Sequence, residues 1–202
     1  NGEFHVIGGS LTYPAGGNVE LTTSGAKFYS KNSALSLGQN FSNSGGLRVL
    51  ENTCLTLQEN FTKAGGTDSL LNVCARIGIN SSGNALGNSS GTTYAINTEF
   101  ELPNGNFANH GGTFTGSNIV IWVKNGNLEN SGTWTASVSK YCVSGSVAIP
   151  GTFLPPAEDC ATISTPFSPC DCSCPIVVPE TCTNGLDDDG DGLVDGADPD
   201  CS

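Results

Sequence analysis

Near the C-terminus, aspartates and glycines recur at a spacing that suits a hard cation. A calcium-binding loop takes oxygen ligands at its first, third, fifth, seventh, ninth and twelfth positions and a glycine at its sixth. On this template Gly192 falls at the sixth position, and the ligands are Asp187, Asp189, Asp191, the carbonyl of Leu193, Asp195 and Asp198. The spacing predicts a Ca²⁺ site rather than a Mg²⁺ site, because Mg²⁺ demands a tighter octahedron and keeps its waters.

A solvated acidic tail is the alternative interpretation of this charge run. The glycine at the turn position and the apolar Val194 beside it favour the calcium loop, since a mere acidic tail needs neither. Aspartates packed this closely would also repel one another without a counter-ion.

The motif Cys182-Thr-Asn-Gly-Leu-Asp-Asp-Asp-Gly-Asp-Gly resembles thrombospondin type 3 repeats and a related loop of secreted bacterial proteins. Its twelfth position is Asp198 rather than Glu, and no flanking helices are evident, so it is not an EF-hand pair. The resemblance implies that Asn184, Asp188 and Asp200 serve a second ion. Cys182 and Cys201 frame the loop, and we expect them to form a disulfide.

The composition predicts an all-β extracellular protein. The 202 residues include 27 Gly, only 7 Lys plus Arg and no Met, which disfavours long helices. The formal net charge of −12 leaves no basic patch for nucleic acid or an anionic membrane. Nine Cys suit an oxidising compartment. No apolar run is long enough to span a membrane, and we interpret Asn1 as a processed mature terminus.

A repeat of about 20–22 residues runs through the body of the chain. Its clearest copies begin with Asn-Phe or Asn-Leu and end near Gly, at residues 40–46, 60–66, 106–112 and 127–133. A unit this short cannot bury its own inner face and must stack on the next one. We therefore predict a parallel β-solenoid of about six coils over residues 18–143. Residues 1–17 are expected to form an N-terminal segment or arm.

The repeat makes predictions for individual side chains. Cys54 and Cys74 each follow their unit's first Asn by 14 residues (40 to 54, 60 to 74), so they should stack and form a disulfide. The leading asparagines should form an inward ladder, with an apolar stack beside it: Asn40, Asn60, Asn106 and Asn127, then Phe41, Phe61, Phe107 and Leu128. Glycosylation is the alternative for Asn40, Asn60, Asn80 and Asn88, and Asn88 is the best candidate.

The repeats resemble those of bacterial surface and adhesin-like β-helices. Residues 144–180 are rich in Pro and Cys and should form a cap or arm, and residues 181–202 hold the calcium loop. Cys142 and Cys160 are expected to pair, while Cys170, Cys172 and Cys174 form disulfides or a metal–thiolate cluster. The apolar run Ile176, Val177 and Val178 lies between prolines and could be a cap strand or a self-association arm.

Catalytic chemistry finds little support. His5 and His110 lie in a terminal segment and a variable turn, and no carboxylate pair recurs at one phase of neighbouring coils. Thr113-Phe-Thr115 and Thr133-Trp-Thr135 suggest a flat threonine face, as in ice binding, but only in two copies. Phe114 and Trp134 are instead candidate exposed aromatics for sugar binding.

The function expected from the sequence is structural. We predict a subunit of an extracellular bacterial filament or surface assembly, a homopolymer that associates head to tail and is stabilised by calcium and disulfides. The alternative is a calcium-dependent adhesin that binds surface carbohydrate. A small polysaccharide-active enzyme is the third hypothesis.

Overall fold

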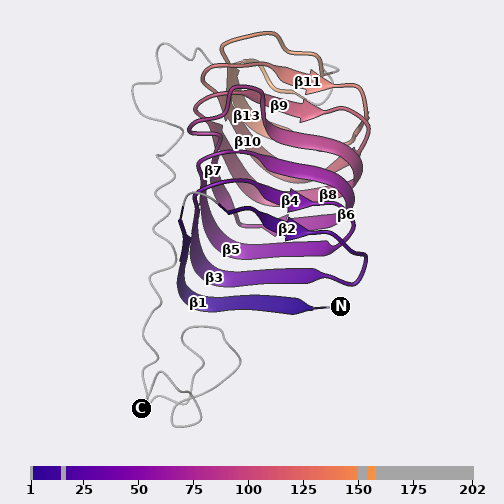
Figure 1. The fold of residues 1–202 in the computed structure, drawn as a ribbon. Helices are drawn as coiled ribbons and strands as arrows, with labels where there is room; N and C mark the ends of the chain where they lie inside the picture. Colours follow the sequence, from indigo (N-terminus) through magenta and orange to yellow (C-terminus); the bar gives the residue numbers. More distant parts are fainter. Residues whose placement is uncertain (1, 15–16, 150–153, 158–202) are drawn as a thin grey trace, which may run out of the picture.

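The protein folds as an all-β parallel solenoid of about seven turns, in a computed structural model that describes residues 2–14, 17–149 and 154–157 (Figure 1). The described residues contain no helix, so none of them forms a helix able to cross a membrane. All strand pairs are parallel, and each strand lies on the strand one repeat away. This confirms the predicted fold class.

Thirteen strands make up the turns: β1 (Glu3–Tyr13), β2 (Val19–Leu21), β3 (Lys27–Leu37), β4 (Phe41–Asn43), β5 (Leu47–Leu57), β6 (Phe61–Leu71), β7 (Cys74–Ile77), β8 (Asn84–Leu102), β9 (Asn106–Asn109), β10 (Thr113–Val123), β11 (Leu128–Asn130), β12 (Thr133–Trp134) and β13 (Val138–Val143). Long strands bend at a corner and serve two sides of the solenoid, so the molecule has three faces.

We name the three faces A, B and C. Face A contains β2, β4, the starts of β6 and β8, β9 and β11. Face B contains the first halves of β1, β3, β5 and β10, together with residues 67–71, 92–96 and β12. Face C contains the second halves of those long strands, with β7, the end of β8 and β13.

An asparagine ladder that the sequence analysis missed forms the corner between faces B and C. Its five members have positive φ angles of 45–54°, a conformation that Asn tolerates better than most residues. From the second member onward, each side-chain NH2 donates to the Oδ1 of the preceding member at 2.9–3.0 Å. The members are Asn32, Asn52, Asn72, Asn97 and Asn118.

The predicted inward asparagine ladder is displaced by three residues. Asn40, Asn60, Asn106 and Asn127 are only half-buried, at the turn before face A. They do bond from turn to turn: the backbone N–H groups of Asn60 and Asn127 donate to Oδ1 of Asn40 and Asn106, whose side-chain amides donate to the asparagines one turn earlier. The buried column is the one that begins with Asn43 and contains Lys63, Asn88, Asn109 and, half-buried, Asn130. A strand side chain two residues after the inward Phe points inward as well, whereas the residue before that Phe lies at a corner.

The predicted apolar stack is confirmed. Phe41, Phe61, Phe107 and Leu128 are buried in one column of face A, with Leu86 between Phe61 and Phe107. Phe41 and Phe61 meet edge to face with their ring centroids 5.7 Å apart. The column continues the core from turn to turn, which is how a short repeat buries its inner side.

The solenoid begins earlier than predicted. Residues 3–13, expected as an arm, form β1 and pair along their length with β3. The sequence repeat misses this turn because its corner uses Gly8, at φ 58°, where the later turns use Asn. The first turn thus has the backbone of the repeat without its motif.

Candidate self-association surface

The N-terminal end of the solenoid is open. β1 pairs with β3 and with no other described strand, so one edge of β1 has no ladder partner among the described residues (Figure 1). An edge strand with unpaired N–H and C=O groups is a template for another chain. Phe4, Ile7 and Tyr13 are 51%, 54% and 42% exposed on this strand.

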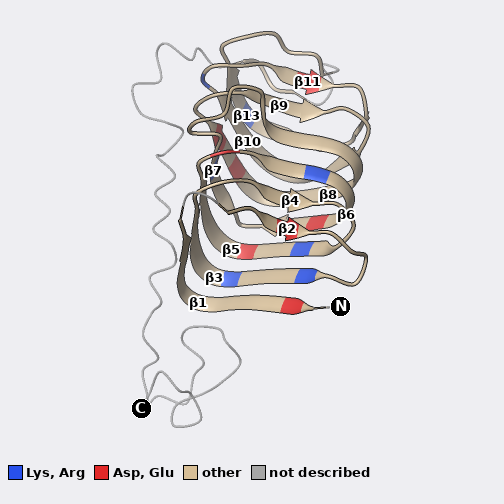
Figure 2. Ribbon diagram, in the orientation of Figure 1, with Lys and Arg blue, Asp and Glu red and all other residues tan. Residues whose placement is uncertain are grey.

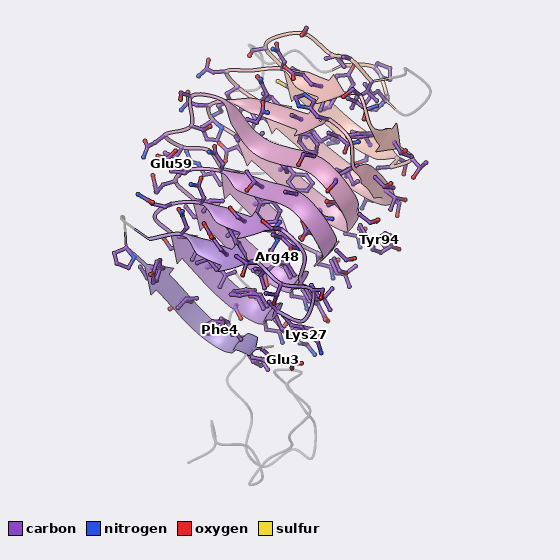
Figure 3. All side chains as sticks on the ribbon, turned by 45° about the vertical axis from the view of Figure 1, so that its right-hand side comes forward. Glu3, Phe4, Lys27, Arg48, Glu59 and Tyr94 are labelled. Carbon is purple, nitrogen blue, oxygen red and sulfur yellow. The ribbon has the colours of Figure 1, made fainter. Side chains whose placement is uncertain are left out.

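A hollow of about 620 Å³ opens inside this end. Its walls are mainly apolar side chains of the first two turns, including Phe4, Leu11, Val19, Leu21 and Phe28. Phe4 and Phe28 stack with their ring centroids 5.5 Å apart, so the aromatic core runs out to the surface here (Figure 3). The hollow is therefore the end of the hydrophobic core, which no further turn of the described chain covers.

Polar groups mark the rim of the hollow. Lys27 Nζ donates to Glu3 Oε1 at 2.6 Å. This hydrogen bond lowers the pKa of Glu3 and raises the pKa of Lys27. Both side chains are solvent-exposed, so the pair contributes little to stability and leaves the apolar interior of the hollow unobstructed.

At the opposite end the chain covers face A. Val147 forms a parallel bridge to Leu128, the last residue of the face A column. Ile149 is buried and Leu154 packs against the core. Among the described strands, β12 and β13 pair only with β10, so faces B and C keep a free edge at this end as well.

Several predicted site residues lie outside the described residues. These are the calcium ligands Asp187, Asp189, Asp191, Leu193, Asp195 and Asp198, the second-ion residues Asn184, Asp188 and Asp200, the arm residues Ile176, Val177 and Val178, and Cys160, Cys170, Cys172, Cys174, Cys182 and Cys201. The calcium site, the arm and the tail disulfides stay predictions. Cys142 is disulfide-bonded, which leaves its predicted pairing with Cys160 untested.

The predicted stacking of Cys54 and Cys74 is confirmed. The two residues are direct Cα partners of β5 and β7. Cys74 is disulfide-bonded. The bond between Cys54 and Cys74 itself stays a prediction.

Two other expectations are corrected by burial. Asn88, the preferred glycosylation candidate, is buried, and its amide donates to Asn109 Oδ1 at 2.9 Å. Phe114 and Trp134, the candidate exposed aromatics, are buried and stack at 4.6 Å. Neither set is accessible to a sugar.

The histidines lie apart from each other. His5 stacks on Tyr29 at the N-terminal end, whereas His110 contacts Glu129 Oε2 at 2.9 Å near the other end. Neither histidine is paired with a Ser, Thr or Cys side chain in these contacts. Among the described residues, no group of three or more His, Cys, Asp or Glu side chains could hold a metal ion.

A carboxylate pair that the sequence analysis missed lies on the outer side of face C. Glu99 and Glu101 are two residues apart on β8, so their side chains lie on the same side of the strand. Glu101 lies 3.5 Å from both Arg76 Nε and Lys124 Nζ. Burial, reinforced by the charge of Glu101, raises the pKa of Glu99 to about 7. The spacing of two residues within one strand would have allowed the sequence to predict this pair.

Glu99→Gln is expected to remove a pH dependence of stability. The folded pKa of about 7 lies above the reference value of 4.5, so Glu99 favours the folded state at low pH and loses that contribution as the pH rises through 7. The variant should be more stable than the parent at pH 8, by less than about 1 kcal/mol after solvent screening, and no more stable at pH 4. Thermal denaturation at both pH values measures this.

The control for this prediction is Glu59→Gln, the same change in the turn between β5 and β6. It should leave the difference between the two pH values as in the parent protein. A Glu99→Gln variant that gains nothing at pH 8 would refute the assignment.

Comparison with known proteins adds no relative. The chain matches no described protein family, and no curated protein or solved structure is significantly similar to it. The likeness to adhesin repeats and to thrombospondin type 3 loops therefore stays an interpretation of short motifs. The solenoid itself rests on the strand register.

Proposed function

We propose that this protein is a self-associating structural subunit of an extracellular bacterial assembly. The observation that carries the proposal is the open N-terminal end, where the free edge of β1 borders an apolar hollow. Terminal repeats of a solenoid need a polar cap for solubility. This end presents Phe4 and the walls of the hollow instead, so burial against another copy would remove them from water.

The segment proposed to fill the hollow is the apolar arm of a neighbouring copy. Ile176, Val177 and Val178 lie between Pro175 and Pro179. Proline has no N–H to offer a ladder, so the prolines would limit pairing to the residues between them. Strand addition by a short extended segment fits a free edge.

Calcium and disulfides enter the proposal as supports of the tail. The loop over residues 187–200 follows the arm by few residues, so an ion bound there would limit the arm's freedom. Ordering a segment before it docks lowers the entropic cost of association. This predicts stronger assembly in calcium than in chelator.

The first test is the self-association of the full chain, measured by sedimentation and negative-stain microscopy with calcium and with chelator. Phe4→Asp should weaken self-association at least tenfold, because it places a charge in an apolar contact. Ile7→Asp is the matched control, since Ile7 is as exposed as Phe4 but does not line the hollow. Wild-type protein that remains monomeric in both conditions would refute the proposal.

The arm is tested separately with Val177→Asp. Loss of assembly in this variant, with the solenoid's thermal midpoint unchanged, is expected. Assembly that persists in Val177→Asp but fails in Phe4→Asp would mean that the hollow takes a different segment.

A further inference from the structure

Two tyrosines lie in one line on the outer side of face B: Tyr94 is exposed, whereas Tyr29 is half-buried and stacks on His5 with the ring centroids 4.7 Å apart. Tyr29 and Tyr94 belong to a column in which the strands pair in direct register, and Val49 and Ser69 lie between them. Three strand spacings separate the rings, or roughly 14 Å. Tyr94 is 41% exposed and projects at the surface of the stack (Figure 3). The residues between the tyrosines are smaller, so the two rings rise above the sheet on either side of a shallow stretch.

A column of hydroxyl groups runs beside the tyrosines. Thr67, Thr92, Thr113 and Thr133 are register partners from turn to turn, on the same outer side. Thr115 continues the tyrosine column beyond Tyr94. The sequence motifs Thr113-Phe-Thr115 and Thr133-Trp-Thr135 are therefore part of a longer array. The aromatic side chains of these two motifs are in the core, and their threonines face outward.

The array is uncharged from the fourth turn onward. The outward residues of face B at positions 67, 69, 71, 92, 94, 96, 113, 115, 117 and 133 contain no Asp, Glu, Lys, Arg or His. Charged outward groups occur on the earlier turns, at Lys27, Lys31 and Glu51, and Figure 2 shows charges on β1, β3 and β5. A protein of net charge −12 that keeps this stretch of face B neutral suits an uncharged partner better than an acidic polymer.

We propose that the outer side of face B binds a chain of a neutral polysaccharide that runs along the stack. Tyr29 and Tyr94 provide rings on which the apolar faces of two sugar units stack, and the threonine column bonds their hydroxyl groups. Aromatic side chains offer a rigid apolar surface, and fixed hydroxyls provide the directional contacts that orient a ligand. Tyr94 stands above the threonines, so a flat ice surface would meet the ring before the hydroxyl array.

The experiment is affinity electrophoresis of the full chain in gels that contain a soluble neutral β-glucan, or polygalacturonate as the acidic counterpart. The neutral glucan should retard the parent protein, and the uronic acid polymer should not. Tyr94→Ala should weaken retardation about tenfold, which is the loss expected of one stacked ring. Tyr94→Phe should bind nearly as well as the parent, because the ring and not the hydroxyl stacks.

Tyr13→Ala is the matched control for Tyr94→Ala. Tyr13 is 42% exposed, but it lines the N-terminal hollow and not face B. Tyr13→Ala should leave retardation unchanged, and Tyr94→Ala should leave self-association unchanged. The proposal is overturned if the parent runs freely in the neutral gel, if the acidic polymer retards it equally, or if Tyr94→Ala binds as the parent does. Inhibition of ice growth by the parent without retardation in either gel would assign the face to ice instead.

Discussion

Replacing Asp68 by Leu is expected to lower the free energy of unfolding by about 3–5 kcal/mol. Asp68 and Arg48 form an ion pair inside the solenoid core, with both side chains at most 1% exposed. Arg48 Nη2 donates to Asp68 Oδ2 at 2.7 Å, and Arg48 Nε donates to Oδ1 at 3.1 Å. Without the carboxylate, the guanidinium would be buried without its counter-charge.

The surroundings of the pair explain why it cannot escape to water. The guanidinium of Arg48 lies 3.5 Å from the centroid of Phe61 and 4.5 Å from that of Phe41. Burial lowers the pKa of Arg48, and the charge of Asp68 opposes that shift. Asn43 also donates to Asp68 at 2.8 Å, so the substitution leaves this amide with one acceptor fewer.

A double-mutant cycle separates the pair from its parts. Arg48→Leu with Asp68→Leu should cost less than Asp68→Leu alone, because no guanidinium is then buried without its counter-charge. Lys27→Ala breaks an exposed ion pair and should cost far less than Asp68→Leu. Denaturant unfolding compares the four proteins of the cycle with Lys27→Ala. Additive losses in the cycle would contradict the predicted coupling.

Replacing Phe107 by Ala is expected to cost about 3–5 kcal/mol as well. Phe107 is fully buried, and its ring centroid lies 5.3 Å from Phe114, 5.4 Å from Phe100 and 5.8 Å from Trp134. This aromatic cluster joins faces A, B and C near the C-terminal end. Truncation would leave a cavity that the surrounding rigid strands cannot close.

The repeat itself offers a control for Phe107. Its register partners in the neighbouring turns are Leu86 and Leu128. Phe107→Leu should therefore cost only about 1–2 kcal/mol, since the column already accepts leucine. Thermal and denaturant unfolding compare the two variants. A Phe107→Leu variant as unstable as Phe107→Ala would mean that ring contacts, and not filled volume, stabilise this layer.

The two stability predictions concern different parts of the solenoid. Both partners of the ion pair lie on face B, and Arg48 joins that face to face A through the rings of Phe41 and Phe61. The aromatic cluster fixes the turns that carry Tyr94. A test of either surface should therefore use variants that leave both layers intact. Phe4, Ile7, Tyr13 and Tyr94 meet this condition because each is more than two-fifths exposed.

The sequence by itself determined the repeat, the fold class and the stacking register. A period of about 20 residues with alternating apolar positions has few solutions other than a short solenoid coil, because each coil needs its neighbours to bury its inner face. The direct pairing of Cys54 with Cys74 and the buried column through Phe41 and Phe61 follow from that register. These features depend on spacing along the chain, which the sequence records.

Only the tertiary structure decided which side chains point inward near the corners and which groups meet across the core. The inward ladder passes through Asn43 and Asn109 rather than Asn40 and Asn106, because the turn before each short strand fixes its phase. Arg48 and Asp68 are one repeat apart, so their pairing follows from the register, but the contacts of the Arg48 guanidinium with Phe41 and Phe61 were visible only in the structure. The first turn lacks the motif, with Gly8 at its corner, so the open end at β1 was visible only in the assembled stack.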